Sequence, residues 1–132
     1  MLIVLGIFAI LFGLGLPISF RAYRAYSFYG EYEQVVGALT TARNRAMVNL
    51  GQSAHAVCYD APAHQVQLVR GPCSASGHPE VLELAAPVEI INWPMGGIAF
   101  EALSGDSSAS GVEIRDAGHS EIITINAYGQ ID

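Results

Sequence analysis

The sequence predicts an α+β fold in which a long N-terminal helix, first membrane-spanning and then amphipathic, packs on a small antiparallel β-sheet domain. Three observations support this fold class. Residues 1–20 are apolar and carry no charge, residues 21–50 keep the apolar spacing of a helix, and after Gly51 the pattern changes to short strand-like segments. Because an apolar helix stripe must be buried against another layer, we expect the helix and the sheet to pack together.

Residues 1–26 are predicted to form a hydrophobic transmembrane or polymerisation helix. About 20 apolar residues are enough to cross a bilayer as one helix. A cleaved signal peptide is the first alternative, but no Lys or Arg precedes the run, and Ile18–Arg21 do not form a small-residue cleavage site. A buried helix of a soluble protein is the second alternative, and such helices seldom stay apolar on all sides. We expect a retained single-pass helix.

Three small or helix-breaking residues in this segment are candidates for a helix-assembly interface. Ala9 and Gly13 form a small-xxx-small pair that lets another helix approach closely. Pro17 lacks an N–H, and its ring crowds the carbonyl group of Gly13. We therefore expect a kink or local loosening over residues 13–17.

Aromatic residues gather where the apolar run ends. Six of the twelve aromatic residues of the chain lie between positions 20 and 32. Arg21 and Arg24 lie among them. This mixture is typical of a membrane–water interface, where aromatic rings settle and arginines extend toward water. Contact between neighbouring helices is a second, compatible interpretation.

Residues 27–51 are predicted to form the amphipathic half of the same helix. Gly51 follows the last periodic residue and suits a helix end. Apolar residues recur at three- and four-residue steps and form one stripe, which consists of Val35, Leu39, Ala42, Ala46 and Leu50.

Residues 52–132 are predicted to form the β-sheet domain. Residues 53–59 and 64–70 flank a turn at Asp60–Ala63, which indicates a hairpin. Residues 71–79 and 104–111 are rich in Gly, Pro or Ser and are expected to be loops, and residues 127–132 are expected to close the domain. Further short strands are predicted at residues 81–84, 88–91, 98–101, 112–115 and 121–126.

Cys58 and Cys73 are the two cysteines of the chain. If the domain is exported, a disulfide between them is plausible. The alternative is a pair of small apolar core residues. The sequence leaves both open.

Composition excludes several classes of function. The net charge is −6, with twelve acidic residues against six arginines and no lysine. Binding to nucleic acid is therefore not favoured, because it needs a cationic surface. No catalytic, cofactor-binding or metal-binding motif occurs, Asp106 alone is far short of a calcium ligand set, and we expect neither an enzyme nor a cofactor. The four histidines have no metal-ligand spacing and are His55, His64, His78 and His119.

The chain resembles the type IV pilin superfamily. Residues 1–17, MLIVLGIFAILFGLGLP, are similar to the hydrophobic signature of pilins and pseudopilins, which ends in a proline. Residues 38–47, ALTTARNRAM, resemble the helix end of the H-type minor pseudopilins. Residues 55–59, HAVCY, and 124–131, TINAYGQI, resemble the first and last strands of that group.

The resemblance implies a structural subunit of a type IV pilus or of a type II secretion pseudopilus. Its partners would be other pilin or pseudopilin subunits, contacted through the N-terminal helix, and inner-membrane lipid before assembly. The subunit would be a single-pass protein of the bacterial inner membrane, with its globular domain in the periplasm or outside the cell. The alternative function is a membrane-anchored exported binding module, such as a DNA-uptake minor pilin.

The beginning of the chain departs from the superfamily pattern. The basic leader, the aromatic first mature residue and the glutamate within the apolar run do not occur before Pro17. We expect the sequence to start at an internal methionine of a longer gene product. Arg21 and Arg24 alone favour a cytoplasmic location for the following domain, whereas the superfamily places it outside.

Overall fold

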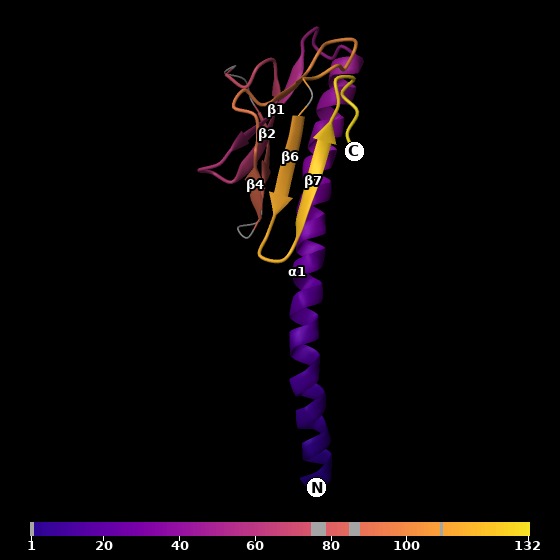
Figure 1. Cartoon of the computed structure of the whole chain (residues 1–132), viewed down its shortest axis with the longest axis vertical. Helices are drawn as coiled ribbons and strands as arrows, with labels where there is room; N and C mark the ends of the chain where they lie inside the picture. The colour runs from indigo at the N-terminus through magenta and orange to yellow at the C-terminus, as the bar shows by residue number, and fades with distance from the viewer. Residues whose placement is uncertain (1, 75–78, 85–87, 109) are drawn as a thin grey trace.

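The computed structural model contains one long helix, which carries a β-rich head at its C-terminal end (Figure 1). The side chains of some helical residues lie outside the described part of the chain, namely those of residues 2, 3, 5, 7–19 and 21. The backbone is described for residues 2–74, 79–84, 88–108 and 110–132.

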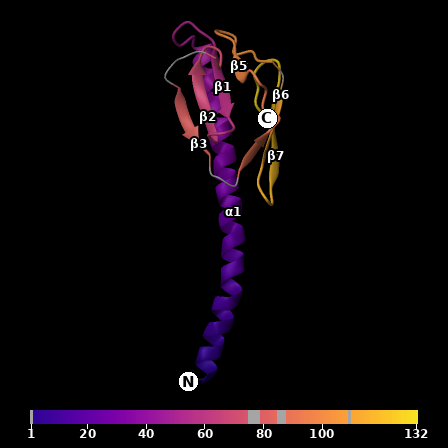
Figure 2. The ribbon, with the colours of Figure 1, turned by 90° about the vertical axis from the view of Figure 1, so that its left-hand side faces the viewer.

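Helix α1 spans Leu2–Met47. Its assignment is uninterrupted over residues 13–17, and Figure 2 shows a gentle curve rather than a sharp kink in the N-terminal part. The helix ends at Met47, earlier than the predicted Gly51, and a turn follows with positive φ at Asn49 and Gly51. The stripe prediction is therefore wrong for Leu50, which leaves the helix and is 54% exposed.

In the described part of the chain, seven strands follow the helix, and each overlaps a strand predicted from the sequence. The sixth begins at Ser110, two residues inside the segment predicted as a loop. All pairings between them are antiparallel. The strands are β1 (His55–Asp60), β2 (Gln65–Arg70), β3 (Glu80–Glu83), β4 (Glu89–Ile91), β5 (Ile98–Phe100), β6 (Ser110–Arg115) and β7 (Ser120–Ile125).

The strands form two sheets. We call the four-stranded sheet, of order β3-β2-β1-β5, sheet A, and the three-stranded sheet, of order β4-β6-β7, sheet B. Figure 2 shows the two sheets on different sides of α1. The predicted α+β class with a long helix packed on antiparallel β-structure is confirmed, and the division into two sheets is a detail that the sequence did not predict.

The core lies between the helix and the two sheets. Four residues of the predicted stripe, Val35, Leu39, Ala42 and Ala46, are completely buried. The helix packs on β1, β2 and β5 of sheet A. Sheet B adds buried side chains to the same cluster, which include Val112, Ile114, Ile123 and Ile125. One apolar stripe of α1 thus organises both sheets.

A disulfide joins Cys58 on β1 to Cys73 in the loop after β2, with a Cα–Cα distance of 5.7 Å. Gly97, which precedes β5, lies against it. Gly97 has a φ of 76°, and a Cβ atom there would overlap the Cys73 sulfur and lie 2.8 Å from the Val57 carbonyl oxygen. The close approach requires glycine, so the disulfide and the start of β5 fit together.

Replacement of both cysteines by alanine is expected to destabilise the head. The disulfide closes a loop with a sequence separation of 15. Loss of a crosslink of this size costs about 3 kcal/mol on the loop-entropy model. Urea unfolding of the full chain in detergent measures the loss of stability. Reduction of the disulfide in the native protein should lower the free energy of unfolding by the same amount. An unchanged free energy of unfolding in both experiments would contradict the prediction.

Candidate assembly surface at the base of the head

The predicted helix-assembly residues lie in the part of α1 that extends beyond the head. Ala9, Gly13 and Pro17 are helical in their backbone, and their side chains lie outside the described part of the structure. Within the described residues, we find no helix with a stretch long and apolar enough to cross a membrane. The predicted span falls mostly on the side chains of residues 7–19, which are not described.

Exposed aromatic side chains lie on one half of the circumference of α1 where it enters the head, and we call them the aromatic collar. Their exposed fractions are 63% for Phe20, 73% for Tyr23, 80% for Tyr26 and 49% for Tyr29. Exposed apolar residues on a protein surface are usually scattered singly. Several large ones on one short helix segment are typical of an interaction surface. The aromatic cluster of the sequence thus becomes a surface rather than a core.

Two aromatic residues of the cluster face the core: Phe28 is 1% exposed and belongs to it, and the half-buried Tyr32 packs against it. The Phe28 ring stacks on the imidazole of His119, with ring centroids 5.3 Å apart and an interplanar angle of 23°. Tyr29 contacts the Phe28 ring edge-to-face at 5.6 Å. The turn between β6 and β7 is therefore held against α1 at the level of the aromatic collar.

Asp116 holds the turn between β6 and β7 in shape. Its Oδ1 atom accepts hydrogen bonds from the backbone N–H groups of Gly118 and His119, both at 2.7 Å, and lies 3.2 Å from Nδ1 of His119. Burial raises the pKa of Asp116, but the two N–H groups and the His119 ring lower that pKa by more, so the net shift is downward. The ionised carboxylate is thus the form that fits this turn.

A largely apolar hollow of about 370 Å³ lies between the helix and the base of the head. It is lined by Phe20, Tyr23, Arg24, Ser27, Phe28, Val88 and Asp116. Arg24 also borders a second hollow, beside residues 116–119. Within the described part of the chain, no ion pair involves Arg24. At the base of the head, Arg24 therefore lies beside the rings of Phe20, Tyr23 and Phe28 and forms no ion pair among the described residues.

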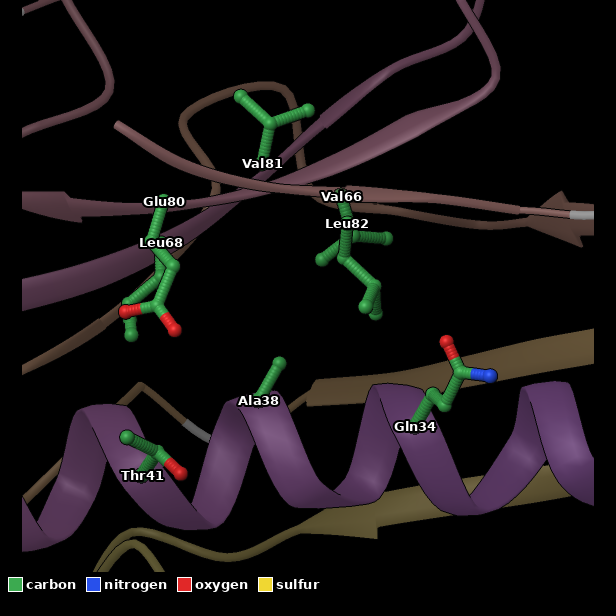
Figure 3. Close-up of a pocket in the computed structure, with 8 residues that line it drawn as sticks. All are labelled: Gln34, Ala38, Thr41, Val66, Leu68, Glu80, Val81 and Leu82. Atoms are coloured by element: carbon green, nitrogen blue, oxygen red, sulfur yellow. The ribbon is translucent and has the colours of Figure 1, made fainter. Parts of the chain in front are cut away.

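A smaller hollow of about 170 Å³ lies between α1 and β3 (Figure 3). Leu68 and Leu82 extend toward the helix, whereas Val81 points away from it. Arg45 on α1 pairs with Glu80 at 2.8 Å. This hollow is smaller than the ligand pockets of proteins, which measure about 300–1,000 Å³, so we interpret it as a packing gap under an edge strand.

The histidines do not form a metal site in the described residues. No group of three or more His, Cys, Asp or Glu side chains comes together there, and His78 lies outside the description. His55 is 4% exposed, and its Nδ1 atom lies 3.2 Å from the Ala54 carbonyl oxygen. Burial, aided by Arg45 and Arg70, lowers the pKa of His55. His55 is therefore a neutral core residue at pH 7.

Sequence reasoning missed the contact between His119 and Phe28. The turn Asp116–His119 contains an Asp and a Gly, which favour turns. Nothing local in the sequence indicates that this turn reaches the helix, because the two rings are 91 positions apart. The aromatic cluster at residues 20–32 predicted where the aromatic collar lies, but it did not predict that the Phe28 side chain points into the core.

The comparisons with known proteins bear on the fold. No protein-family model matches the chain in sequence, and neither does any curated protein. The structure is similar to that of the minor pseudopilin EpsH from the type 2 secretion system of Vibrio cholerae, with a TM-score of 0.60. The match covers 80% of this chain and 94% of the EpsH chain, at 11% sequence identity. The chain therefore has the fold of a minor pseudopilin, as its resemblance to the pilin superfamily implied.

Asp116→Asn is expected to lower the free energy of unfolding at pH 7 by about 1 kcal/mol, the difference between hydrogen bonds to a charged and to a neutral acceptor. A carboxylate with a lowered pKa stabilises the fold above the ordinary carboxyl pKa of about 4, and this stabilisation is lost as the pH falls through the lowered value. The difference between wild type and variant should therefore vanish in acid.

Urea unfolding of the full chain in detergent, from neutral pH down to about pH 2, measures this dependence. Asp60→Asn is the matched control, because the Asp60 carboxylate accepts a single turn bond, from Ala63 N at 3.3 Å. We expect a smaller loss from the control. A difference for Asp116→Asn that persists unchanged in acid would contradict the role of its charge.

Proposed function

We propose that the chain is a structural subunit of a type IV pilus or of a type II secretion pseudopilus, and not an enzyme. The observation that carries the proposal is the single continuous helix Leu2–Met47, in which Phe28 is the first core residue among the described side chains. At 1.5 Å per residue, about 40 Å of helix precedes that contact. The likeness to a minor pseudopilin supports the proposal and favours a minor component.

The N-terminal half of α1 is proposed to act first in lipid and then in the filament. Residues 1–20 carry no charge, which favours storage in the bacterial inner membrane as a single-pass helix. During assembly the same segment packs on the equivalent helices of other pilin or pseudopilin subunits. Ala9 and Gly13 permit close approach, and Pro17 lets the segment adjust.

The head is proposed to lie in the periplasm or outside the cell. Support comes from the disulfide between Cys58 and Cys73, because disulfides persist in oxidising compartments. The DNA-uptake alternative gains no support from the charge of the head. Residues 52–132 contain ten acidic residues and two arginines, and residues 116–132 contain no Lys or Arg. An acidic surface repels the phosphate backbone.

Gly13→Leu is expected to weaken association of the helices, because the leucine side chain separates two closely packed helices. Two differently tagged full-length copies are expressed together, and their co-purification from detergent-solubilised membranes is measured. We expect the recovered partner to fall by about tenfold, which corresponds to roughly 1.4 kcal/mol.

Gly15→Leu is the matched control. It makes the same change about 200° around the helix from Gly13, away from Ala9. We expect it to leave co-purification unchanged. Equal losses from both variants, or no co-purification of the wild-type copies, would contradict the proposed packing surface.

A further inference from the structure

Two hollows share lining residues at the base of the head, beside the turn between β6 and β7 (Figure 1), and we call them together the basal site. The larger hollow, of about 370 Å³, is mostly apolar and includes Phe20 and Val88. The other, of about 250 Å³, lies against residues 116–119. Arg24 and Asp116 line both hollows and so lie at their boundary. A site that is apolar on one side and charged on the other suits an amphiphilic ligand.

The residues that α1 contributes to the basal site lie on one face of the helix. They recur at steps of three and four positions and are Phe20, Tyr23, Arg24, Ser27 and Phe28. Tyr26, which lines neither hollow, lies about 160° around the helix from Arg24. The basal site is therefore a separate surface from the outward part of the aromatic collar.

The basal site contains a cation and a carboxylate that do not pair with each other. Among the described residues, Arg24 forms no ion pair with Asp116 or with any other side chain. The Asp116 side chain is only 9% exposed. In the same part of the chain, all of its hydrogen-bonding contacts are made by Oδ1, with two backbone N–H groups and the His119 ring. The Asp116 Oδ2 atom is therefore left as an acceptor for a ligand.

The level of the basal site along α1 matches the headgroup layer of a bilayer. The uncharged residues 1–20 are long enough to cross the hydrocarbon core. The headgroup layer beyond that core is about 5–8 Å thick on each side. Arg24 lies about 6 Å beyond Phe20 along the helix axis. When the apolar segment spans the membrane, the Arg24 guanidinium lies at the depth of the lipid phosphates.

We propose that the basal site binds a phospholipid whose headgroup carries both a phosphate and a primary ammonium, as in phosphatidylethanolamine. The Arg24 guanidinium donates hydrogen bonds to the phosphate, and the ammonium donates to Oδ2 of Asp116. The first part of an acyl chain packs on Phe20 and Val88. This proposal rests on the part of the proposed function that places residues 1–20 in the membrane.

The two charges favour this headgroup over other phospholipids. Phosphatidylglycerol carries only the negative phosphate, which the carboxylate of Asp116 repels at close range. Phosphatidylcholine carries both charges, but its trimethylammonium group has no N–H to donate to Asp116. The basal site should therefore select the ethanolamine headgroup from both.

Native mass spectrometry of the full chain in detergent at pH 7 measures lipid binding. Phosphatidylethanolamine, phosphatidylglycerol and phosphatidylcholine with identical acyl chains are added separately at equal concentrations. We expect one molecule of phosphatidylethanolamine to be retained, and each of the other two lipids to bind about tenfold more weakly. Equal binding of all three lipids, stronger binding of either of the other two, or no retained lipid would overturn the proposal.

Arg24→Gln tests the phosphate contact. We expect it to weaken the binding of phosphatidylethanolamine by about tenfold, because the charge-assisted hydrogen bonds are lost. Its thermal midpoint should stay unchanged, since Arg24 has no ion pair to lose among the described residues. Arg45→Gln is the matched control, because it removes the same charge about 32 Å further along α1 and breaks only a surface ion pair, with Glu80. Equal losses of lipid from both variants would contradict the assigned site.

Asp116→Asn tests the ammonium contact through lipid preference. The variant keeps Arg24 and removes the carboxylate, so phosphatidylglycerol should now bind at least as well as phosphatidylethanolamine. A purely structural role of Asp116 would weaken the binding of all three lipids alike. An unchanged preference for phosphatidylethanolamine would therefore overturn the assignment of Asp116.

The failures of the two proposals are distinguishable. If no lipid is selected while tagged copies still co-purify and respond to Gly13→Leu, the basal site fails and the proposed function stands. If phosphatidylethanolamine is selected but Gly13→Leu has no effect, the helix-packing proposal fails and the lipid site stands. If the full chain does not float with phosphatidylethanolamine vesicles after detergent removal, the membrane location fails, and the lipid site fails with it.

Discussion

The buried stripe of α1 is the contact on which the rest of the head depends. Val35 and Leu39 are completely enclosed, and both sheets add their buried side chains to the same cluster. Full burial of an aliphatic side chain contributes about 1.5–3 kcal/mol, whereas a small domain is stable by about 5–15 kcal/mol. Because sheet A and sheet B share this stripe, a polar residue in it would detach both sheets.

The continuity of α1 links the head to the apolar segment mechanically. Phe28 is the first helical core residue among the described side chains, and Pro17 lies 11 positions earlier, about 16 Å along the axis. A bend near Pro17 therefore moves the apolar segment without disturbing the packing of the head. Under the proposed function, this separation would let the N-terminal half adjust to lipid or to neighbouring helices while the head keeps one structure.

The elements could be predicted from the sequence because their signals are local, whereas their arrangement depends on distant contacts. The spacing of Val35 and Leu39 and the alternation in residues 64–70 revealed the helix stripe and a strand. The division into two sheets was not predictable, because it depends on the pairing of β1 with β5, which lies about 40 residues later. Leu50 was wrongly predicted to belong to the helix for a related reason. The helix ends at Met47, where the N–H group of Leu103, which is distant in sequence, donates a hydrogen bond to the Ala46 carbonyl oxygen.

The aromatic cluster at residues 20–32 shows how one sequence signal divides into two structural roles. Phe28 turns inward because His119 provides a ring to stack on and Val88 lies beside it. Tyr23 and Tyr26 meet no such partners and stay exposed. Helical geometry imposes this division, because residues on a helix that winds along one side of a head cannot all face that head. The inward ring fixes the base of the head on α1, and the outward rings leave a surface for another molecule at the same level.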